Sequence, residues 1–182
     1  MAPDDAELIR RYRAGDPDAF EALVRRYQRP LGTYLYRLTG SRAAADDLFQ
    51  ETFLKALRGL PGYDERGRFG SWLFGIATNV ASDAWRRNRG WREQVTADPE
   101  AVDLAPDPAP LPDAEAERRD ILGKIESALP EIPLKQRRVF LLRQHTDLTF
   151  REIAELLDEP LNTVLGHMRN ATIRLRKALE LE

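Results

Sequence analysis

The sequence predicts an all-α protein with two small helical domains, an N-terminal helical bundle and a C-terminal helix-turn-helix domain, joined by a flexible acidic linker. Apolar residues recur at steps of three and four through most of the chain, which is the spacing of one helix face. The pattern stops at residues 94–112, where five prolines stand among aspartates and alanines. We therefore expect domains at 1–93 and 113–182, with a linker at 94–112.

The composition excludes several classes of protein. The 182 residues include no cysteine, which rules out a disulfide framework, a thiolate metal site and a thiol nucleophile. No apolar run approaches the ~18 residues of a membrane span, and the N-terminus lacks the apolar core of a signal peptide. The two histidines, His145 and His167, are too far apart to suggest a metal pair. We expect a cytoplasmic protein with no cofactor, metal site or catalytic residue.

The net charge of −2 conceals an uneven distribution. Residues 91–117 hold one basic and eight acidic side chains, whereas the segments on either side are weakly basic. Local basic faces matter more for binding DNA than the total charge does. The distribution is therefore compatible with two DNA-binding domains around an acidic connector.

Cap and turn residues divide the N-terminal domain into helices. A short helix is predicted over residues 5–13. Asp16 or Asp18 can cap the next helix, which continues past Pro30 until Gly40 closes it.

A third helix is predicted from Ser41 to Leu60, with polar residues outside its buried stripe. Its acidic first half and basic second half have two interpretations. They suit the helix dipole, and they could also form a docking face for a basic partner. The polar residues are Asp46, Asp47, Gln50, Glu51 and Lys55.

A fourth helix is predicted over residues 69–89, after a polar, glycine-rich loop. Its end carries basic residues interleaved with tryptophans. This composition suits single-stranded or distorted DNA, because arginines bind phosphates and aromatic faces stack on bases for ~1–3 kcal/mol each. Alternatively, the tryptophans pack inside and the arginines are only solvated. The cluster comprises Trp85, Arg86, Arg87, Arg89, Trp91 and Arg92.

In the C-terminal domain, helices over residues 113–129 and 134–145 precede two more helices joined by a tight turn. Thr149 and Glu152 form a capping box, and Pro160 breaks the first helix of the pair. Asn162 or Thr163 is expected to cap the second.

This final pair of helices has the shape of a helix-turn-helix, whose second helix enters the DNA major groove by its first turns. The alternative is an ordinary helical hairpin with a solvated polar face. The apolar stripe of the second helix is Val164, Met168, Ala171, Leu175 and Leu179. Its polar face carries His167, Arg169, Asn170, Arg174 and Lys177.

Together the motifs resemble the extracytoplasmic-function sigma factors, the smallest promoter-specificity subunits of bacterial RNA polymerase. The first conserved domain of that family resembles, in order and spacing, GDPDAFEALVRRY, DDLFQETFLKALR and FGSWLFGIATNVASDAWRR. The second resembles LPEIPLKQRRVFLLRQHTDLTFREIAELLDEPLNTV. The resemblance implies a protein that is not an enzyme, directs core RNA polymerase to promoter DNA and starts melting. An anti-sigma factor is the usual regulator in that family.

The resemblance also implies roles for three groups of residues. A docking strip for the clamp helices of the polymerase's largest subunit would comprise Asp46, Asp47, Gln50, Glu51 and Leu54. The −10 group, which would capture and melt the −10 element, comprises Tyr63, Asp64, Arg66, Arg68, Trp72, Asn79, Asp83, Arg86 and Arg87. The −35 group, which would read the −35 element in duplex DNA, comprises Asn162, Thr163, Leu165, Gly166, Arg169 and Asn170.

The chain departs from the family pattern in both DNA-reading helices. These departures leave open the −35 sequence and the strength of the phosphate contacts. Gly166 costs its helix ~1 kcal/mol relative to alanine, so it either permits a close approach of the backbone to DNA or only weakens the helix. The departures are Gly70, Gly75 and Thr78 in the melting helix, and Leu165, Gly166 and His167 in the recognition helix.

Two other functions also suit the patterns. One is a stand-alone helix-turn-helix regulator that binds duplex DNA without polymerase, and the other is a helical protein-interaction module. The Trp- and Arg-rich first domain and the acidic linker speak against the regulator, which needs neither. A pull-down of core polymerase separates these alternatives.

Overall fold

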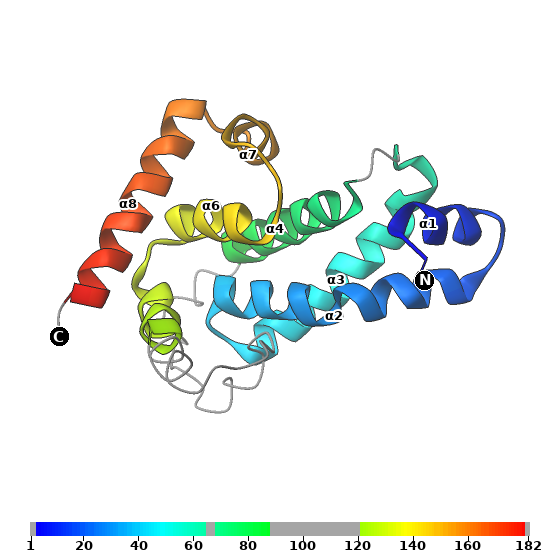
Figure 1. The fold of residues 1–182 in the computed structure, drawn as a ribbon, viewed down its shortest axis with the longest axis horizontal. Helices are drawn as coiled ribbons and strands as arrows, with labels where there is room; N and C mark the ends of the chain where they lie inside the picture. Colours follow the sequence, from blue (N-terminus) through cyan, green and yellow to red (C-terminus); the bar gives the residue numbers. More distant parts are fainter. Residues whose placement is uncertain (1–2, 65–67, 88–120, 181–182) are drawn as a thin grey trace.

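The structure is a computed structural model that describes residues 3–64, 68–87 and 121–180. Within these ranges all regular elements are helical (Figure 1), so the predicted all-α class is confirmed. No helix in them is both long and apolar enough to cross a membrane. The predicted linker lies outside the described residues, as do Arg66, Arg89, Trp91 and Arg92. The elements are α1 (Asp5–Arg13), α2 (Pro17–Thr39), α3 (Arg42–Gly59), η1 (Leu60–Gly62), α4 (Phe69–Arg87), a helical stretch at 121–128, η4 (Leu129–Glu131), α6 (Leu134–His145), α7 (Phe150–Leu157) and α8 (Leu161–Glu180).

Short polar caps set the helix boundaries in the N-terminal domain, as the sequence predicts. The Asp16 carboxylate caps α2 by accepting from the Asp18 amide at 3.1 Å. The helix then runs unbroken through Pro30. Gly40 ends it with a φ of 72°, a left-handed conformation that costs glycine little. The Ser41 hydroxyl caps α3 by accepting from a backbone amide of its first turn at 3.4 Å.

A hydroxyl pair in the N-terminal core joins α2 to α4. The Thr78 hydroxyl donates to the Phe74 carbonyl at 2.7 Å, so the fully buried Tyr34 must donate to Thr78 Oγ1 at 2.5 Å. Burial raises the pKa of Tyr34, which keeps its hydroxyl protonated. Thr78 is thus a core residue, which explains why this position holds no basic side chain.

In the C-terminal domain the predicted capping box is present. The Glu152 amide donates to Thr149 Oγ1 at 3.3 Å, and the Thr149 amide donates to the Glu152 carboxylate at 2.7 Å. α7 then ends at Asp158, which has a left-handed φ of 51°. A short polar residue tolerates this conformation better than most, so Asp158 turns the chain without a glycine.

The prediction that Asn162 or Thr163 caps α8 is wrong, because the helix starts at Leu161. The Pro160 carbonyl accepts from the amides of Thr163 at 2.9 Å and Val164 at 3.1 Å. Proline suits this position because its fixed φ is compatible with the start of a helix. Asn162 and Thr163 therefore lie in the first turn of α8.

The two domains pack against each other, with α6 lying against α2 and α4 (Figure 1). The ring of His145, at the end of α6, stacks on Phe74 of α4 with centroids 5.8 Å apart. It also meets Tyr34 of α2 edge-on at 5.6 Å. Burial, together with the charge of Arg37, lowers the pKa of His145 to about 4. The imidazole is therefore neutral at pH 7 and serves as part of the apolar interface.

Arg137 stabilises the interface between the two domains from a buried position, with only 6% of its surface exposed. Its guanidinium donates to the Leu38 carbonyl of α2 at 3.0 Å, across the domain boundary. It also donates to the carbonyls of Pro130 at 2.8 Å and Ile132 at 3.0 Å. Burial lowers the pKa of Arg137 to about 10, which still leaves the side chain charged at neutral pH. One buried cation thus satisfies carbonyls from both domains.

Candidate functional site

The predicted docking strip follows the outer face of α3. Asp46, Asp47 and Gln50 are exposed, Glu51 is half-buried, and Leu54 leaves 54% of its surface in solvent. Residues three and four apart are neighbours on a helix surface, so the five side chains form one continuous strip. An exposed leucine beside carboxylates suits a partner surface that carries both apolar and basic groups.

Ion pairs connect this strip to α4. Lys55 Nζ lies 3.3 Å from a Glu51 oxygen and 3.9 Å from an Asp83 oxygen. Arg87 also approaches Glu51, at 3.8 Å. Because the side chains are more than a third exposed, each pair contributes at most about 1 kcal/mol. Lys55 lies outside the predicted site groups, although its spacing of four from Glu51 is a usable signal for the first pair.

Three aromatic rings meet where the chain enters α4. The Trp72 ring lies 4.6 Å from that of Tyr63 and 5.6 Å from that of Phe69, measured between centroids. Arg13 of α1 stabilises the segment before α4. Its guanidinium donates to the carbonyl of Tyr63 and, at 2.9 Å, to that of Leu60. Trp72 and Tyr63 are half-buried, so both pack and both keep part of their surface accessible. The role of Arg13 was missed, because nothing in the local pattern of α1 indicates this contact.

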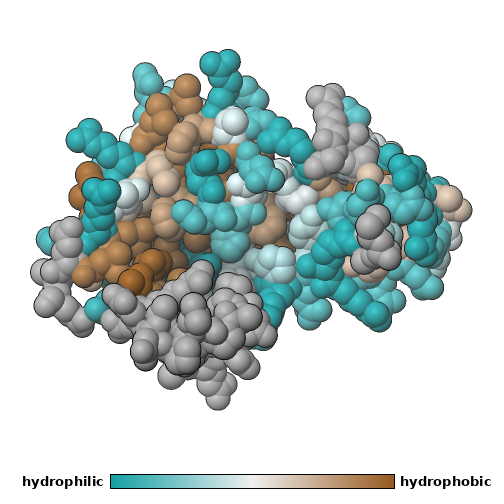
Figure 2. Space-filling view, viewed as in Figure 1, coloured by the Kyte–Doolittle hydropathy of each residue, from teal (hydrophilic) through white to brown (hydrophobic). Residues whose placement is uncertain are grey.

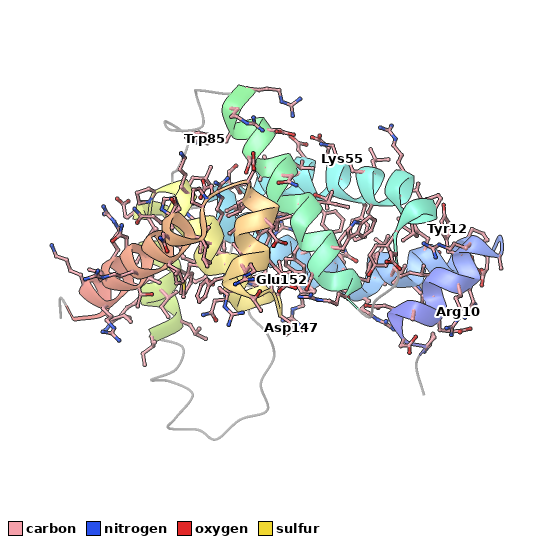
Figure 3. All side chains as sticks on the ribbon, turned by 90° about the horizontal axis from the view of Figure 1, so that it is seen from above. Arg10, Tyr12, Lys55, Trp85, Asp147 and Glu152 are labelled. Carbon is pink, nitrogen blue, oxygen red and sulfur yellow. The ribbon has the colours of Figure 1, made fainter. Side chains whose placement is uncertain are left out.

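The end of α4 carries the exposed basic part of the −10 group. Arg86, Arg87 and Asn79 are exposed, and Asp83 accepts a hydrogen bond from Arg86. Trp85 leaves 36% of its surface in solvent. Figure 3 places Trp85 near this end of the helix, with Lys55 on the neighbouring α3. Exposed cations next to an accessible indole match the composition expected for binding unpaired nucleic acid.

At the opposite end of α4, Arg68 pairs with the other domain. Its guanidinium donates to the Glu152 carboxylate of α7, whereas Asp64 in the preceding loop is exposed. The Glu152 pKa is lowered to about 2 by Arg68 first and then by the Thr149 amide and hydroxyl. In this arrangement Arg68 faces a carboxylate of α7 instead of standing free in solvent.

The six residues of the −35 group lie on the first three turns of α8. Figure 2 shows that this side of the molecule also carries hydrophobic surface, and Leu165 is 42% exposed. Gly166 is half-buried, and a Cβ at this position would have no atom within 4 Å. The other members of the group are all exposed: Asn162, Thr163, Arg169 and Asn170.

His167, predicted on the polar face of α8, instead points into the turn before the helix. Its side chain is 19% exposed, and Nε2 lies 3.4 Å from Glu159 Oε2. Glu159 also pairs with Arg138 of α6 at 2.5 Å. The reason is spacing, because His167 lies three residues after the buried Val164 and four before the buried Ala171. Among the described residues, no group of three potential metal ligands includes either histidine.

Two segments of the chain match families of known proteins. Residues 23–91 match the family Sigma-70 region 2, and residues 122–175 match Sigma-70, region 4. The solved structure of the sigma factor RpoE in complex with the anti-sigma factor NepR, from Bartonella quintana, has a TM-score of 0.64. It covers 90% of this chain and 98% of its own, at 21% identity, and therefore supports the fold alone.

Two relatives align with nearly the whole chain. The RNA polymerase sigma-H factor of Pseudomonas aeruginosa is 30% identical over 183 residues, which cover 97% of this chain and 94% of that protein. The ECF RNA polymerase sigma-E factor of Salmonella typhimurium is 30% identical over 187 residues, which cover 97% and 92%. With both sigma regions in order and full-length relatives at this identity, the chain belongs to the extracytoplasmic-function (ECF) sigma factors.

Proposed function

We propose that this protein directs core RNA polymerase to promoters, through the docking strip on α3, the −10 group around α4 and the −35 group on α8. The observation that carries the proposal is that three chemically different exposed surfaces lie on three separate helices. The proposed place of action is the cytoplasm, and the proposed role needs no chemistry of its own.

The energetics of melting favour a protein that works only with a larger partner. Opening duplex DNA costs on the order of 1.4 kcal/mol per base-pair step. Opening a dozen steps exceeds what a chain of this size can supply. Capturing an extruded base recovers a few kcal/mol where melting starts, and the half-buried Trp72 and exposed Arg86 and Arg87 are suited to that task.

An inhibitory protein partner is also part of the proposal. The RpoE structure is a complex with the anti-sigma factor NepR. In the present chain, α8 exposes Leu161, Leu165 and Ile173, at 37%, 42% and 52% of their surfaces. Exposed apolar side chains of this kind suit a protein partner in addition to DNA.

The proposal predicts that the two DNA-binding groups fail in different ways. Asn170→Ala should weaken binding to the upstream duplex and relax its sequence preference, because one good base contact contributes ~1–3 kcal/mol of discrimination. Arg86→Ala combined with Arg87→Ala should impair opening more than upstream binding. Run-off transcription with holoenzyme, on matched duplex and pre-melted templates, measures both effects. Equal loss on both templates with Asn170→Ala contradicts the division of labour.

Gly166→Ala tests why the recognition helix contains a glycine. A Cβ at Gly166 meets nothing in the free protein, so alanine should stabilise the helix by about 1 kcal/mol. If the backbone of α8 approaches DNA closely here, the same methyl group should weaken binding to the upstream duplex. We expect a higher urea midpoint together with a weaker duplex affinity in a fluorescence-anisotropy titration. Unchanged affinity would show that the glycine has no part in the DNA contact.

A further inference from the structure

Three polar side chains from three different elements meet at the turn between α7 and α8. The Arg138 guanidinium of α6 donates to Glu159 Oε1 in the turn at 2.5 Å. The other carboxylate oxygen of Glu159 lies 3.4 Å from His167 Nε2 of α8. The side chains of Arg138, Glu159 and His167 leave only 12%, 14% and 19% of their surfaces exposed. One carboxylate therefore lies between α6 and the helix that carries the −35 group.

The backbone of the turn restricts where the Glu159 carboxylate can be. Asp158 before it has the left-handed φ of 51°, and Pro160 after it limits the conformation of the preceding residue. The Glu159 amide also donates to the Ala154 carbonyl of α7 at 3.0 Å. Because Glu159 is held in this way, its distance from His167 depends mainly on the position of α8.

The hydrogen bonds of this cluster are incomplete. Among the described residues, Arg138 Nε, Glu159 Oε2 and His167 Nε2 are buried polar atoms without a hydrogen-bond partner. Buried polar atoms are nearly always paired, since an unpaired one is unfavourable. The 3.4 Å between Glu159 and His167 exceeds the usual range of an N–H···O bond, about 2.7–3.2 Å, by only a few tenths of an ångström. A small shift of α8 toward the turn, with a proton on Nε2, would pair both atoms.

Apolar packing alone does not fix the position of α8 on α6. The two helices pack against each other, and Val164 and Ala171 of α8 are buried. Neither side chain carries a polar group, and hydrophobic attraction has no preferred direction. A hydrogen bond between charged or polar groups depends on both distance and angle. The contact of His167 with Glu159 can therefore determine how far α8 slides and turns on α6.

A displacement at His167 also moves the residues that would read bases. Arg169 follows His167 by two positions, which places it about 200° around the helix, on the other side. It is exposed, as is Asn170 next to it. Over so few residues a helix moves as one body, so Arg169 and Asn170 shift with His167. Hydrogen bonds to base edges need accurate placement, because they too depend on distance and angle.

We propose that Glu159 sets the position of α8 for reading the −35 element, with Arg138 holding its carboxylate from α6 and His167 binding it from α8. The three are positioning residues that act through Arg169 and Asn170, and none of them contacts DNA. The cluster is argued from contacts inside the C-terminal domain, whereas its effect on DNA reading rests on the proposed function.

Nuclear magnetic resonance of the imidazole nitrogens tests the contact itself. The chain has only two histidines, His145 and His167, so His167→Gln identifies the signals of each. Glu159→Gln should move the Nε2 signal of His167 and leave that of His145 in place. Glu131→Gln is the matched control, because Glu131 is exposed and lies in η4, outside the helix-turn-helix. A His167 signal that stays in place in Glu159→Gln, or moves equally in Glu131→Gln, contradicts the contact.

Sequence preference tests the role of the cluster in DNA reading. Holoenzyme with the natural chain selects an upstream duplex from a pool of random sequence, and anisotropy titrations compare this duplex with a scrambled one. The ratio of the two affinities should fall about tenfold in Glu159→Gln and in His167→Leu, because a displaced helix loses base contacts and keeps phosphate contacts. His167→Gln should keep most of the preference, since its amide nitrogen can donate where Nε2 does. Glu131→Gln should match the natural chain.

The positioning role is overturned if Glu159→Gln keeps the natural ratio of affinities with its helical circular dichroism intact. It is also overturned if Glu159→Gln loses affinity equally for both duplexes and unfolds at a lower urea concentration, because the cluster then only stabilises the fold. If the natural chain selects no sequence at all, the proposed function fails, while the contact between Glu159 and His167 still stands on the magnetic resonance result.

Discussion

Reversing two charges on α3, Asp47→Lys with Glu51→Lys, should abolish binding to core RNA polymerase while leaving the fold intact. Asp47 is exposed, and Glu51 makes only weak, partly exposed ion pairs. Truncating one member of a charge pair buried at an interface typically costs ~2–5 kcal/mol, and reversal adds repulsion. The expected loss is therefore at least about thirtyfold, and several thousandfold at the upper end.

Binding to core polymerase can be followed by fluorescence anisotropy of a labelled chain, with helical circular dichroism as the check on folding. Glu21→Lys with Glu155→Lys makes the same change in net charge at exposed positions outside α3. This control should bind nearly as well as the natural chain. If the two double variants bind core polymerase with equal affinity, α3 is not the docking surface.

Arg137→Met should destabilise the fold strongly, by about 3 kcal/mol or more, because it removes several buried hydrogen bonds at once. Methionine fills much of the same space, but it cannot donate to the carbonyls of Leu38, Pro130 and Ile132. Each buried carbonyl left unpaired costs ~1–3 kcal/mol, and rehydration recovers part of that. The variant should therefore unfold at a clearly lower urea concentration, measured by far-ultraviolet circular dichroism.

Arg176→Met is the appropriate reference for this substitution, because Arg176 lies exposed on α8. It should shift the midpoint of unfolding very little, since surface changes usually stay within about 0.5 kcal/mol. Similar midpoints for the two variants would mean that water replaces the guanidinium at little cost. Arg137→Lys should fall between the natural chain and Arg137→Met, because one ammonium cannot reach all the carbonyls that the planar guanidinium fork reaches.

The helix boundaries that sequence reasoning predicted correctly are those set by neighbouring residues. The caps at Asp16, Ser41 and Thr149 act within three residues, and Gly40 needs only its own left-handed conformation. Helix caps and a glycine terminus of this kind can therefore be predicted from a few neighbouring residues of the sequence. The start of α8 differs from the predicted one because the Pro160 carbonyl accepts the first amides of the helix, and no capping side chain marks that position in the sequence.

The features that were missed depend on partners far away in the sequence. Arg137 looks like any other cation in a helix, and its burial follows from carbonyls supplied by α2 and by the turn before α6. The space beside Gly75 is filled by Leu156, a residue of the other domain. Two missed features do have a local signal: His167 is placed at the edge of the buried stripe by its spacing from Val164 and Ala171, and Lys55 lies four residues after Glu51.

Tryptophan and tyrosine are distributed unevenly between the two domains. All 3 tryptophans and all 5 tyrosines fall within residues 1–91, so the residues that give intrinsic fluorescence all belong to the N-terminal domain. Far-ultraviolet circular dichroism reports on helices of both domains. Coincident unfolding curves from the two probes indicate one cooperative unit, whereas separated curves indicate domains that melt independently. The natural chain should give coincident curves. Gly75→Gln should separate them, because a longer side chain at Gly75 meets Leu156 of the other domain. Comparing the two curves therefore measures how strongly the two domains are coupled.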